Sequence, residues 1–326
     1  MALDQYGRSI NYLRISLTDQ CNLRCRYCMT ETMTFQPPEA LMQNDEVIRL
    51  ARIFTELGFR KFRLTGGEPT LRHELVPLVR ALAGIPGVRD ISMTTNGVLL
   101  KHLAKPLREA GLHRLNVSID TLDPARFKLI TRWGNFQDVW NGLMIAEDLG
   151  FPIKINAVPV RGLNDNEDVI ALARLTLAHA WQVRFIEMMP FGVTSEFQKD
   201  RVVTQAELMA AIQNALGALH VQRDGQLDGE ARCYRLDHAP GEIGFISSVS
   251  QPFCSGCNRA RLTADGVLRL CLLRDKELPL LPLLRGGAND LEMKQIIESA
   301  IWFKPWGHGL AEHVIPRNRL MSEIGG

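Results

Sequence analysis

Residues 13–28 have the sequence LRISLTDQCNLRCRYC, in which an apolar run leads directly into a loop with three cysteines. The run Tyr12–Thr18 predicts a buried strand, and the loop places Cys21, Cys25 and Cys28 with the spacing C-x3-C-x2-C. A structural zinc site usually takes four ligands as paired C-x2-C units, so zinc is the less favoured interpretation. Three thiolates on one short loop can instead hold three irons of a four-iron cluster and leave the fourth iron open to a substrate.

Strand and helix patterns alternate from this loop up to Met189-Pro190. Short β-branched runs predict buried strands at Tyr12–Thr18, Lys61–Thr65, Asp90–Thr95, Arg114–Ile119, Ile153–Val160 and Val183–Met188. One-sided apolar patterns predict helices at Asp45–Leu57, Leu75–Leu82, Val98–Ala110, Gln137–Leu149 and Asp165–Ala178. Such alternation is typical of a parallel sheet with right-handed crossovers.

Six strand–helix units are too few to close an eight-stranded barrel, so the predicted fold is a partial (β/α)6 TIM-like barrel or an open sheet. In both forms, ligands bind beyond the carboxyl ends of the strands. The residues expected at this rim are Thr18, Gly66–Gly67, Thr94–Gly97, Ser118–Asp120, Val158 and Met188. After a further helix, Gln205–Leu219, the polar segment Arg223–Glu230 is interpreted as a hinge. We therefore expect a barrel domain over residues 1–230 and a smaller C-terminal α+β domain over residues 231–326.

Composition narrows the class of protein. The length of 326 residues agrees with two domains, and an apolar share of 46% excludes wholesale disorder. A formal net charge of +2 gives no reason to expect general nucleic-acid binding. No apolar run is long enough for a membrane span, and residues 1–5 do not begin a signal peptide. We expect a soluble cytoplasmic protein, whose seven cysteines indicate metal-binding or catalytic thiols rather than disulfides.

A second group of cysteines lies towards the other end of the chain. Cys254, Cys257 and Cys271 have the spacing C-x2-C-x13-C, which again leaves one position of a metal site open. A zinc site with Cys233 or His238 as its fourth ligand stays an alternative on spacing alone. Otherwise Cys233 is expected to be a buried structural thiol.

Basic residues accompany both ends of the predicted site. Arg259 and Arg261 follow the second cysteine pair, and arginine side chains match phosphate oxygens in a bidentate manner. Arg14, Arg63 and Lys154 lie in predicted strands. Each one alone is more often a solvated surface charge, but five cations that converge on one opening would indicate a polyanionic ligand.

The cysteine loop and the segment Gly66-Gly67-Glu68-Pro69, which follows the second predicted strand, together resemble the radical S-adenosylmethionine superfamily over residues 10–200. This resemblance implies that Cys21, Cys25 and Cys28 bind a [4Fe–4S] cluster, whose open iron takes the amino acid end of S-adenosylmethionine. It implies that this cofactor is bound by Tyr27, Gly67, Glu68, Ser118 and Met188. One-electron reduction would then yield methionine and a 5′-deoxyadenosyl radical, while the protein positions and shields the cofactor.

Three further stretches resemble the molybdenum cofactor biosynthesis protein A family, whose members are GTP 3′,8-cyclases. They are LRISLTDQC at 13–21, FCSGCNRAR at 253–261 and the terminal Gly325-Gly326. The resemblance implies a second [4Fe–4S] cluster on Cys254, Cys257 and Cys271 that binds the guanine of GTP. It implies that GTP is contacted by Arg14, Arg63, Thr94, Lys154, Arg259, Ala260 and Arg261. The residues with an implied catalytic role are Arg14, Arg259 and Arg261, which would hold the triphosphate, and Gly325 and Gly326, whose tail would enter the cavity.

The implied reaction removes the hydrogen at C3′ of GTP and joins C3′ to guanine C8, which gives 3′,8-cyclo-7,8-dihydro-GTP. The implied partners are GTP, a flavodoxin-like or ferredoxin-like electron donor and a downstream cyclic pyranopterin monophosphate synthase, with a homodimer as a further candidate. Neither a membrane nor nucleic acid is expected as a partner.

Two other functions stay open on the sequence. The first is a radical S-adenosylmethionine enzyme whose C-terminal cluster serves the modification of a peptide or protein. The second is a zinc-binding scaffold without catalysis. The sequence gives no role to Arg24, Arg26 or the loop Thr30–Leu41, which is interpreted as a surface loop.

Overall fold

The computed structural model describes residues 2–190, 197, 200–310, 316 and 319–325. Its strands are β1 (Tyr12–Ser16), β2 (Lys61–Thr65), β3 (Asp90–Thr95), β4 (Arg114–Ser118), β5 (Ile153–Ala157), β6 (Gln182–Ile186), β7 (His220–Val221), β8 (Leu227–Asp228), β9 (Ala231–Arg235), β10 (Glu242–Ile246), β11 (Arg259–Leu262), β12 (Val267–Arg269) and β13 (Glu277–Pro279). In the described residues they form a thirteen-stranded sheet with the order β13-β12-β11-β1-β2-β3-β4-β5-β6-β10-β9-β7, and β8 pairs with β9. The pairs from β1 to β6 are all parallel, which confirms the predicted α/β class.

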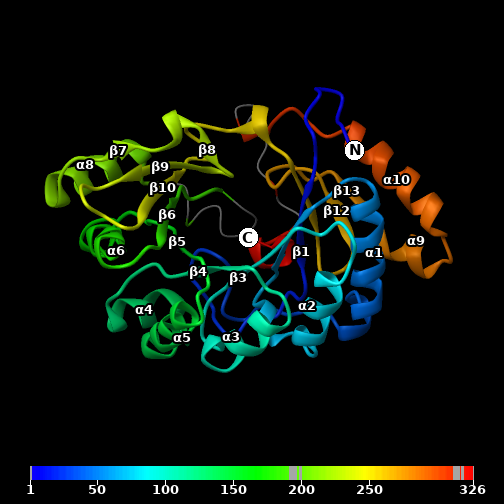
Figure 1. The fold of residues 1–326 in the computed structure, drawn as a ribbon, viewed down its shortest axis with the longest axis horizontal. Coiled ribbons are helices and arrows are strands. Elements are labelled where there is room, and N and C mark those ends of the chain that lie inside the picture. Colours follow the sequence, from blue (N-terminus) through cyan, green and yellow to red (C-terminus); the bar gives the residue numbers. More distant parts are fainter. Residues whose placement is uncertain (1, 191–196, 198–199, 311–315, 317–318, 326) are drawn as a thin grey trace.

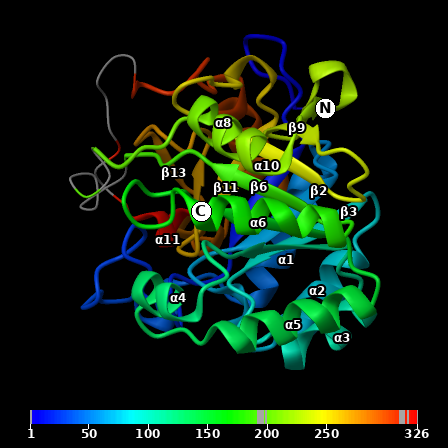
Figure 2. The same ribbon diagram turned by 90° about the vertical axis from the view of Figure 1, so that its left-hand side faces the viewer.

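Helices between these strands cover the outer face of the curved sheet (Figures 1 and 2). They are α1 (Asn44–Glu56), α2 (Leu75–Ala83), α3 (Leu100–Glu109), α4 (Pro124–Thr131), α5 (Phe136–Asp148) and α6 (Glu167–Ala178), with 3-10 helices η1 (Pro38–Ala40) and η2 (Pro69–Leu71). The sequence analysis missed α4. Its start is nevertheless encoded locally, because Asp123 accepts a hydrogen bond from the Arg126 N–H and Pro124 occupies the first helical position.

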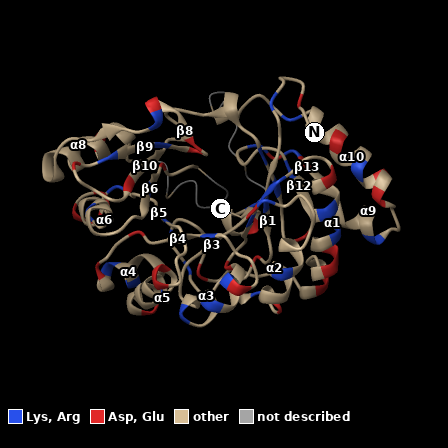
Figure 3. Ribbon diagram, in the orientation of Figure 1, with Lys and Arg blue, Asp and Glu red and all other residues tan. Residues whose placement is uncertain are grey.

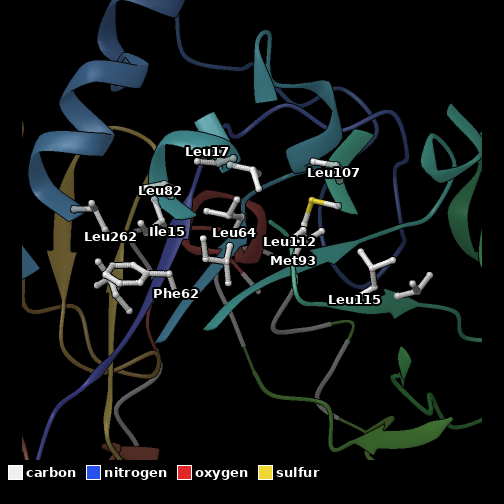
Figure 4. Close-up of a cluster of buried hydrophobic side chains, with 14 of the residues drawn as sticks. Ile15, Leu17, Phe62, Leu64, Leu82, Met93, Leu107, Leu112, Leu115 and Leu262 are labelled. Carbon is white, nitrogen blue, oxygen red and sulfur yellow. The ribbon is translucent and has the colours of Figure 1, made fainter. Parts of the chain in front are cut away.

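The main hydrophobic core lies between the sheet and these helices (Figure 4). Ile15, Leu64 and Met93 extend from three neighbouring strands towards Leu82 of α2 and Leu107 of α3, and all five side chains are buried. Successive side chains of a strand point to opposite faces. The residues that alternate with this core therefore face the inside of the curved sheet, where polar side chains occur.

Several predicted strands end earlier than expected. β1 ends at Ser16, β5 at Ala157 and β6 at Ile186, where the sequence predicted Thr18, Val160 and Met188 as the last strand residues. The residues beyond these ends belong to the loops at the carboxyl rim. The apolar character of such loop residues explains the error, because burial at the rim gives the same pattern as burial in a strand.

The C-terminal part of the chain extends the sheet at both edges. β10 pairs in parallel with β6, and β11 pairs in parallel with β1. The expected hinge Arg223–Glu230 contains a 3-10 turn, η4 (Arg223–Gly225), and strand β8, so this segment is a part of the sheet rather than a free linker. Strands from both sides of residue 230 thus share one sheet, and the proposed division at that residue stays a prediction.

The remaining helices flank this part of the sheet. They are α8 (Gln205–Leu216), η5 (Cys254–Gly256), α9 (Leu281–Arg285), α10 (Asp290–Trp302) and α11 (Met321–Ile324). α11 lies inside the curve of the sheet, near the centre of the molecule (Figure 1). Among the described helices, none combines the length and the apolar character that crossing a membrane would require.

Candidate active site

A cavity of about 320 Å³ lies at the carboxyl ends of the strands. The predicted site residues that line it are Arg14, Cys21, Cys25, Tyr27, Cys28, Arg63, Gly67, Glu68, Thr94, Ser118, Met188, Cys254, Cys257, Arg259, Arg261 and Cys271. Lys154, Ala260 and Gly325 are not part of this lining, and Gly326 lies outside the described residues. Ala260 is buried in the hydrophobic core because its side chain alternates with those of the two flanking arginines.

The first cysteine loop is stabilised by Arg24, a residue without a predicted role. The Arg24 Nη1 donates hydrogen bonds to the carbonyl oxygens of Cys21 at 2.6 Å and Leu23 at 2.8 Å. Its guanidinium also lies over the rings of Phe35 and Trp133. The loop conformation thus depends on an arginine within the loop and on an aromatic ring from the segment that the sequence analysis interpreted as a plain surface loop.

The three cysteines of this loop are partly buried, and their thiols act electrostatically on one another. Burial raises the pKa of Cys21 to about 11, and burial together with Cys21 and Asp120 raises the pKa of Cys28 to about 12. The pKa of Cys25 is also raised, by burial first and then by Cys28. A cationic group is needed to stabilise three such thiolates together, and an iron–sulfur core supplies positive charge to thiolate ligands.

Within the described residues, no group of three His, Cys, Asp or Glu side chains could hold a single metal ion. The thiolates that bind a four-iron cluster each ligate a different iron, so a cluster does not require convergence on one point. The donor set of three partly buried cysteines on one loop therefore fits a [4Fe–4S] cluster.

Glycine is required where the second strand ends. A Cβ atom at Gly66 would overlap the carbonyl oxygen of Thr18, and one at Gly67 would overlap the carbonyl oxygen of Gln20. The Gly67 N–H donates to the Thr18 carbonyl at 2.7 Å. These two glycines let the backbone pass directly against the start of the cysteine loop.

Glu68 is held in a fixed orientation at the border of the cavity. Its carboxylate accepts hydrogen bonds from the Thr70 N–H at 3.1 Å, the Thr95 hydroxyl at 2.7 Å and the Asn96 N–H at 2.7 Å. Burial raises the pKa of Glu68, while these donors oppose the shift. The arrangement presents an oriented carboxylate beside the cysteine loop, which suits a ligand with an ammonium group.

The other residues predicted to bind S-adenosylmethionine line the same cavity. The Tyr27 hydroxyl donates to the Asp120 carboxylate at 2.7 Å, and the Val158 N–H donates to the other oxygen at 2.8 Å. Burial raises the pKa of Asp120 to about 6. Ser118 lies at the end of β4 and Met188 follows β6, and both side chains line the cavity.

The second cysteine group lines the same cavity. Cys254 opens η5, Cys257 follows that turn, and Cys271 follows β12. Burial would raise the pKa of Cys257, but the charges of Lys304 and Arg259 prevail and lower this pKa to about 6. Burial raises the pKa of Cys271. The basic environment therefore favours the thiolate form of Cys257, as a metal ligand requires.

Three arginines form a row across neighbouring strands. Arg14 of β1 is in register with Arg63 of β2 on one side and with Arg261 of β11 on the other, so all three side chains point to one face. Burial and the charges of Arg63 and Arg261 lower the pKa of Arg14 well below its usual value. Figure 3 shows basic residues along these strands, where they border the cavity. Buried cations that lie side by side repel one another and require an anionic partner.

Two carboxylates that the sequence analysis missed pair with the predicted substrate residues. Glu230 forms ion pairs with Arg14 and, at 2.7 Å, with Arg259. Asp228 pairs with Lys154 at 2.7 Å, and burial lowers the pKa of this lysine to about 8. Asp228 and Glu230 are two acidic residues in a polar stretch directly before a strand, which was a signal in the sequence. The sequence analysis interpreted this stretch as a hinge and therefore gave the two residues no role.

Arg184 and Asn156 also line the cavity and were missed. They occupy paired positions of β6 and β5, and an arginine inside an apolar strand was the available signal.

Several buried polar atoms of the cavity have no hydrogen-bond partner within the described part of the chain. They are the Nε atoms of Arg14 and Arg63, Thr94 Oγ1 and Asn156 Oδ1. Buried polar atoms are rarely left unsatisfied, so these atoms indicate a polar ligand.

The tail of the chain packs against the arginine row. The carbonyl oxygens of Ile324, at 3.3 Å, and of Gly325 both accept hydrogen bonds from the Arg261 guanidinium. Ile324 is fully buried and belongs to the same small hydrophobic cluster as Leu273. Gly325 has a φ of +69°, and a Cβ atom there would overlap Thr65 at the end of β2. Glycine at this position thus allows the tail to lie directly on the strand ends.

Two family models match the chain. The model described as Radical SAM superfamily matches residues 15–175, and the model described as Molybdenum Cofactor Synthesis C matches residues 181–310. The curated relatives include the GTP 3′,8-cyclase of Pelotomaculum thermopropionicum, which is 47% identical over 325 residues with 99% of both chains covered. The GTP 3′,8-cyclase of Moorella thermoacetica is 44% identical over 325 residues, with 99% of both chains covered.

Solved structures show the same fold at low sequence identity. The crystal structure of Streptococcus suis SuiB bound to S-adenosylmethionine has a TM-score of 0.62 and 14% identity, and the match covers 90% of this chain and 68% of that chain. SuiB bound to the precursor peptide SuiA has a TM-score of 0.64 and 14% identity, with coverage of 94% and 66%. Identities this low support the fold alone.

Proposed function

The chain belongs to the GTP 3′,8-cyclase family of radical S-adenosylmethionine enzymes, and from this premise we propose how its residues share the conversion of GTP to 3′,8-cyclo-7,8-dihydro-GTP. The peptide-modifying alternative is not favoured, because the relatives that match along the whole chain are GTP 3′,8-cyclases. The two [4Fe–4S] clusters and S-adenosylmethionine are the cofactors of this family. When bound at the first cysteine loop, cluster and cofactor supply a 5′-deoxyadenosyl radical by one-electron reduction.

The observation that carries the assignment of the substrate site is the row formed by Arg14, Arg63 and Arg261. Three buried guanidinium groups at paired strand positions require an anion, and the Nε atoms of Arg14 and Arg63 have no partner among the described residues. We assign this row, together with Arg259, to the triphosphate, because arginine binds phosphate oxygens with two parallel hydrogen bonds. Thr94 offers an unpaired hydroxyl on the neighbouring strand for a further contact.

Before substrate binds, Glu230 and Asp228 form ion pairs with some of these cations. A triphosphate that binds Arg14 and Arg259 competes with the Glu230 carboxylate, which lies in the same cavity. We assign Lys154 to GTP as well, with the condition that its ion pair with Asp228 opens. Phosphate binding therefore displaces, rather than simply adds to, the internal ion pairs.

The orientation of the reaction depends on where the two cysteine groups hold their ligands within one cavity. Gly67 and Glu68 line this cavity together with Cys21, Cys25 and Cys28, and we assign both to the ammonium group of S-adenosylmethionine, with Tyr27, Ser118 and Met188 around the rest of this cofactor. Cys254, Cys257 and Cys271 line the same cavity, and we assign them to a second cluster, which would anchor the guanine. GTP bound there would present its ribose to S-adenosylmethionine.

Exclusion of water is assigned to the tail of the chain. Gly325 packs over the ends of β1 and β2 and bonds to Arg261, so the tail covers the substrate arginines without adding side-chain bulk. A carbon radical abstracts hydrogen from most nearby C–H bonds, so a closed, ordered cavity protects the reaction. Gly326 is included in this proposal on the family resemblance.

The decisive experiment is anaerobic incubation of the reconstituted full-length protein with GTP, S-adenosylmethionine and dithionite. We expect 5′-deoxyadenosine and the cyclised nucleotide to form only when GTP is present, and about eight irons per chain from two four-iron clusters. Deoxyadenosine formation that is independent of GTP, or a chain that takes up zinc but no iron, would overturn the proposal.

The remaining partners follow from this chemistry. We propose a flavodoxin-like or ferredoxin-like protein as electron donor and a cyclic pyranopterin monophosphate synthase as the enzyme that takes the product, with a homodimer as the assembly. A cytoplasmic location agrees with six thiol ligands that must stay reduced.

A further inference from the structure

Lys304 is a buried lysine that lies two residues after the end of α10. Its side chain is among the largest fully buried side chains of the described structure, with 2% of the residue exposed. The Nζ atom donates hydrogen bonds to the carbonyl oxygen of Arg259 at 2.8 Å and to that of Leu270. One of these acceptors belongs to a proposed substrate arginine, and the other directly precedes Cys271. The ammonium group therefore joins the two segments that carry the second cysteine group.

The charge of Lys304 lacks a carboxylate partner in the described part of the chain, where every ion pair of a buried cation involves other residues. The charged and titratable groups that act on it are Cys257, Cys271, Arg8 and Arg259. Two of these are further cations, so they add to the cost of burial. An isolated buried ammonium is costly unless an anion compensates it, and the two thiols are the groups that can become anionic.

The same segment also fixes the third cysteine. Arg8 donates from Nη1 to the Cys254 carbonyl and to the Trp306 carbonyl, each at 2.7 Å, and from Nη2 to the Pro305 carbonyl at 2.7 Å. Asp4 pairs with Arg8 at 2.6 Å, so this second cation has its own counter-charge. Hydrogen bonds thus connect residues 304–306 to the segments of Cys254 and Cys271. Of the two cations Arg8 and Lys304, only Lys304 has no carboxylate partner among the described residues.

We propose that Lys304 is a positioning residue for the C-terminal iron–sulfur cluster, whose thiolates are the missing counter-charge of its buried ammonium. The proposal deepens the proposed function, because it requires a cluster on Cys254, Cys257 and Cys271. Reduction adds one electron to a cluster that is already anionic through its three thiolates. A fixed buried cation stabilises the more negative form, so Lys304 raises the reduction potential of this cluster.

The test uses the full-length reconstituted protein in the Cys28→Ala background, which leaves the C-terminal cluster as the cluster under observation. Lys304→Met removes the charge at similar volume, and Lys304→Gln keeps a hydrogen-bond donor without the charge. Anaerobic redox titration followed by electron paramagnetic resonance measures the reduced fraction at each potential. At the midpoint of the parent protein, we expect the ratio of reduced to oxidised cluster to fall at least tenfold in both variants, which corresponds to about 59 mV for one electron.

Lys294→Met is the matched control, because Lys294 lies on α10, the helix that precedes Lys304, but is partly exposed and pairs with Glu56. Its midpoint should equal that of the parent protein. Selective loss of the C-terminal cluster from both Lys304 variants, with the first cluster retained when Cys28 is restored, would also support the proposal. An unchanged midpoint would overturn it, as would a general loss of cooperative melting and of both clusters, since Lys304 would then be a packing residue of the whole fold.

These outcomes are separate from those that test the proposed function. If the parent protein binds no C-terminal cluster, the cyclase assignment and the Lys304 proposal both fall. If the cluster is present and its potential does not depend on Lys304, only the Lys304 proposal falls. If the potential shifts but GTP is not cyclised, only the function is wrong.

Discussion

Replacement of Gly325 by alanine tests whether the tail closes the active site. Gly325 adopts a φ of +69°, a left-handed conformation that costs a residue with a Cβ atom about 1–2 kcal/mol. The new methyl group would also overlap the Thr65 side chain and lie 2.6 Å from the Ser16 hydroxyl. Such overpacking typically costs about 1–3 kcal/mol.

The two penalties together amount to about 2–5 kcal/mol against the docked tail. A free energy of 1.4 kcal/mol is a tenfold change in an equilibrium constant, so the docked population falls by roughly 30-fold to several thousand-fold. We therefore expect Gly325→Ala to keep both clusters and its fold but to lose most GTP cyclisation. Anaerobic assay of the cyclised product measures the rate, and limited proteolysis of the C-terminus measures release of the tail.

Gly150→Ala is the matched control for this variant. Gly150 has nearly the same φ, +71°, but no described atom lies within 4 Å of a Cβ built there. The Gly150→Ala variant therefore carries the backbone penalty without a steric overlap and away from the cavity lining. Its rate of GTP cyclisation should equal that of the wild-type protein. If Gly325→Ala and the deletion of both terminal glycines also cyclise GTP at that rate, the tail has no part in closing the site.

Five further substitutions test other parts of the site. Cys28→Ala should abolish formation of 5′-deoxyadenosine, because two thiolates do not hold the first cluster; full production would refute the radical assignment. Cys271→Ala should retain about four irons and lose GTP-dependent turnover, and normal turnover at that iron content would contradict its role. Arg259→Ala and Arg261→Ala should each weaken GTP binding by about 1.5–3 kcal/mol in calorimetry, with little effect on guanosine. Glu230→Gln should strengthen GTP binding and lower the melting temperature, since it frees Arg14 for phosphate but breaks a buried ion pair; weaker binding would argue against competition.

The sequence predicted the features that are encoded locally. The strand of Arg14, the cysteine loop and the Gly66-Gly67 segment follow from short-range patterns, because strand alternation and turn glycines depend on neighbouring residues. The helix α4 was also encoded locally, through Asp123 and Pro124, but its short apolar pattern was too weak to recognise.

Pairing between residues that are far apart in the sequence could not be predicted from the sequence. The register of Arg14 with Arg261 depends on β11 joining β1 across most of the sequence. The pairing of Glu230 with Arg14, and the position of Lys304 beside the segment of Cys271, depend on the same closure. Single charged residues carry no periodic signal, so only the folded arrangement distinguishes these buried groups from ordinary surface charges.

The addition of β10 and β11 to opposite edges of the sheet also determines how the protein can be synthesised. Until residues 242–262 have left the ribosome, both β6 and β1 expose unpaired backbone groups as open edges. Open edges of a parallel sheet pair readily with other chains. A nascent or truncated chain that stops before residue 242 is therefore expected to aggregate or to bind chaperones rather than to persist as a free barrel. The edges at β6 and β1 are covered only after residues 242–262 have been synthesised and have paired.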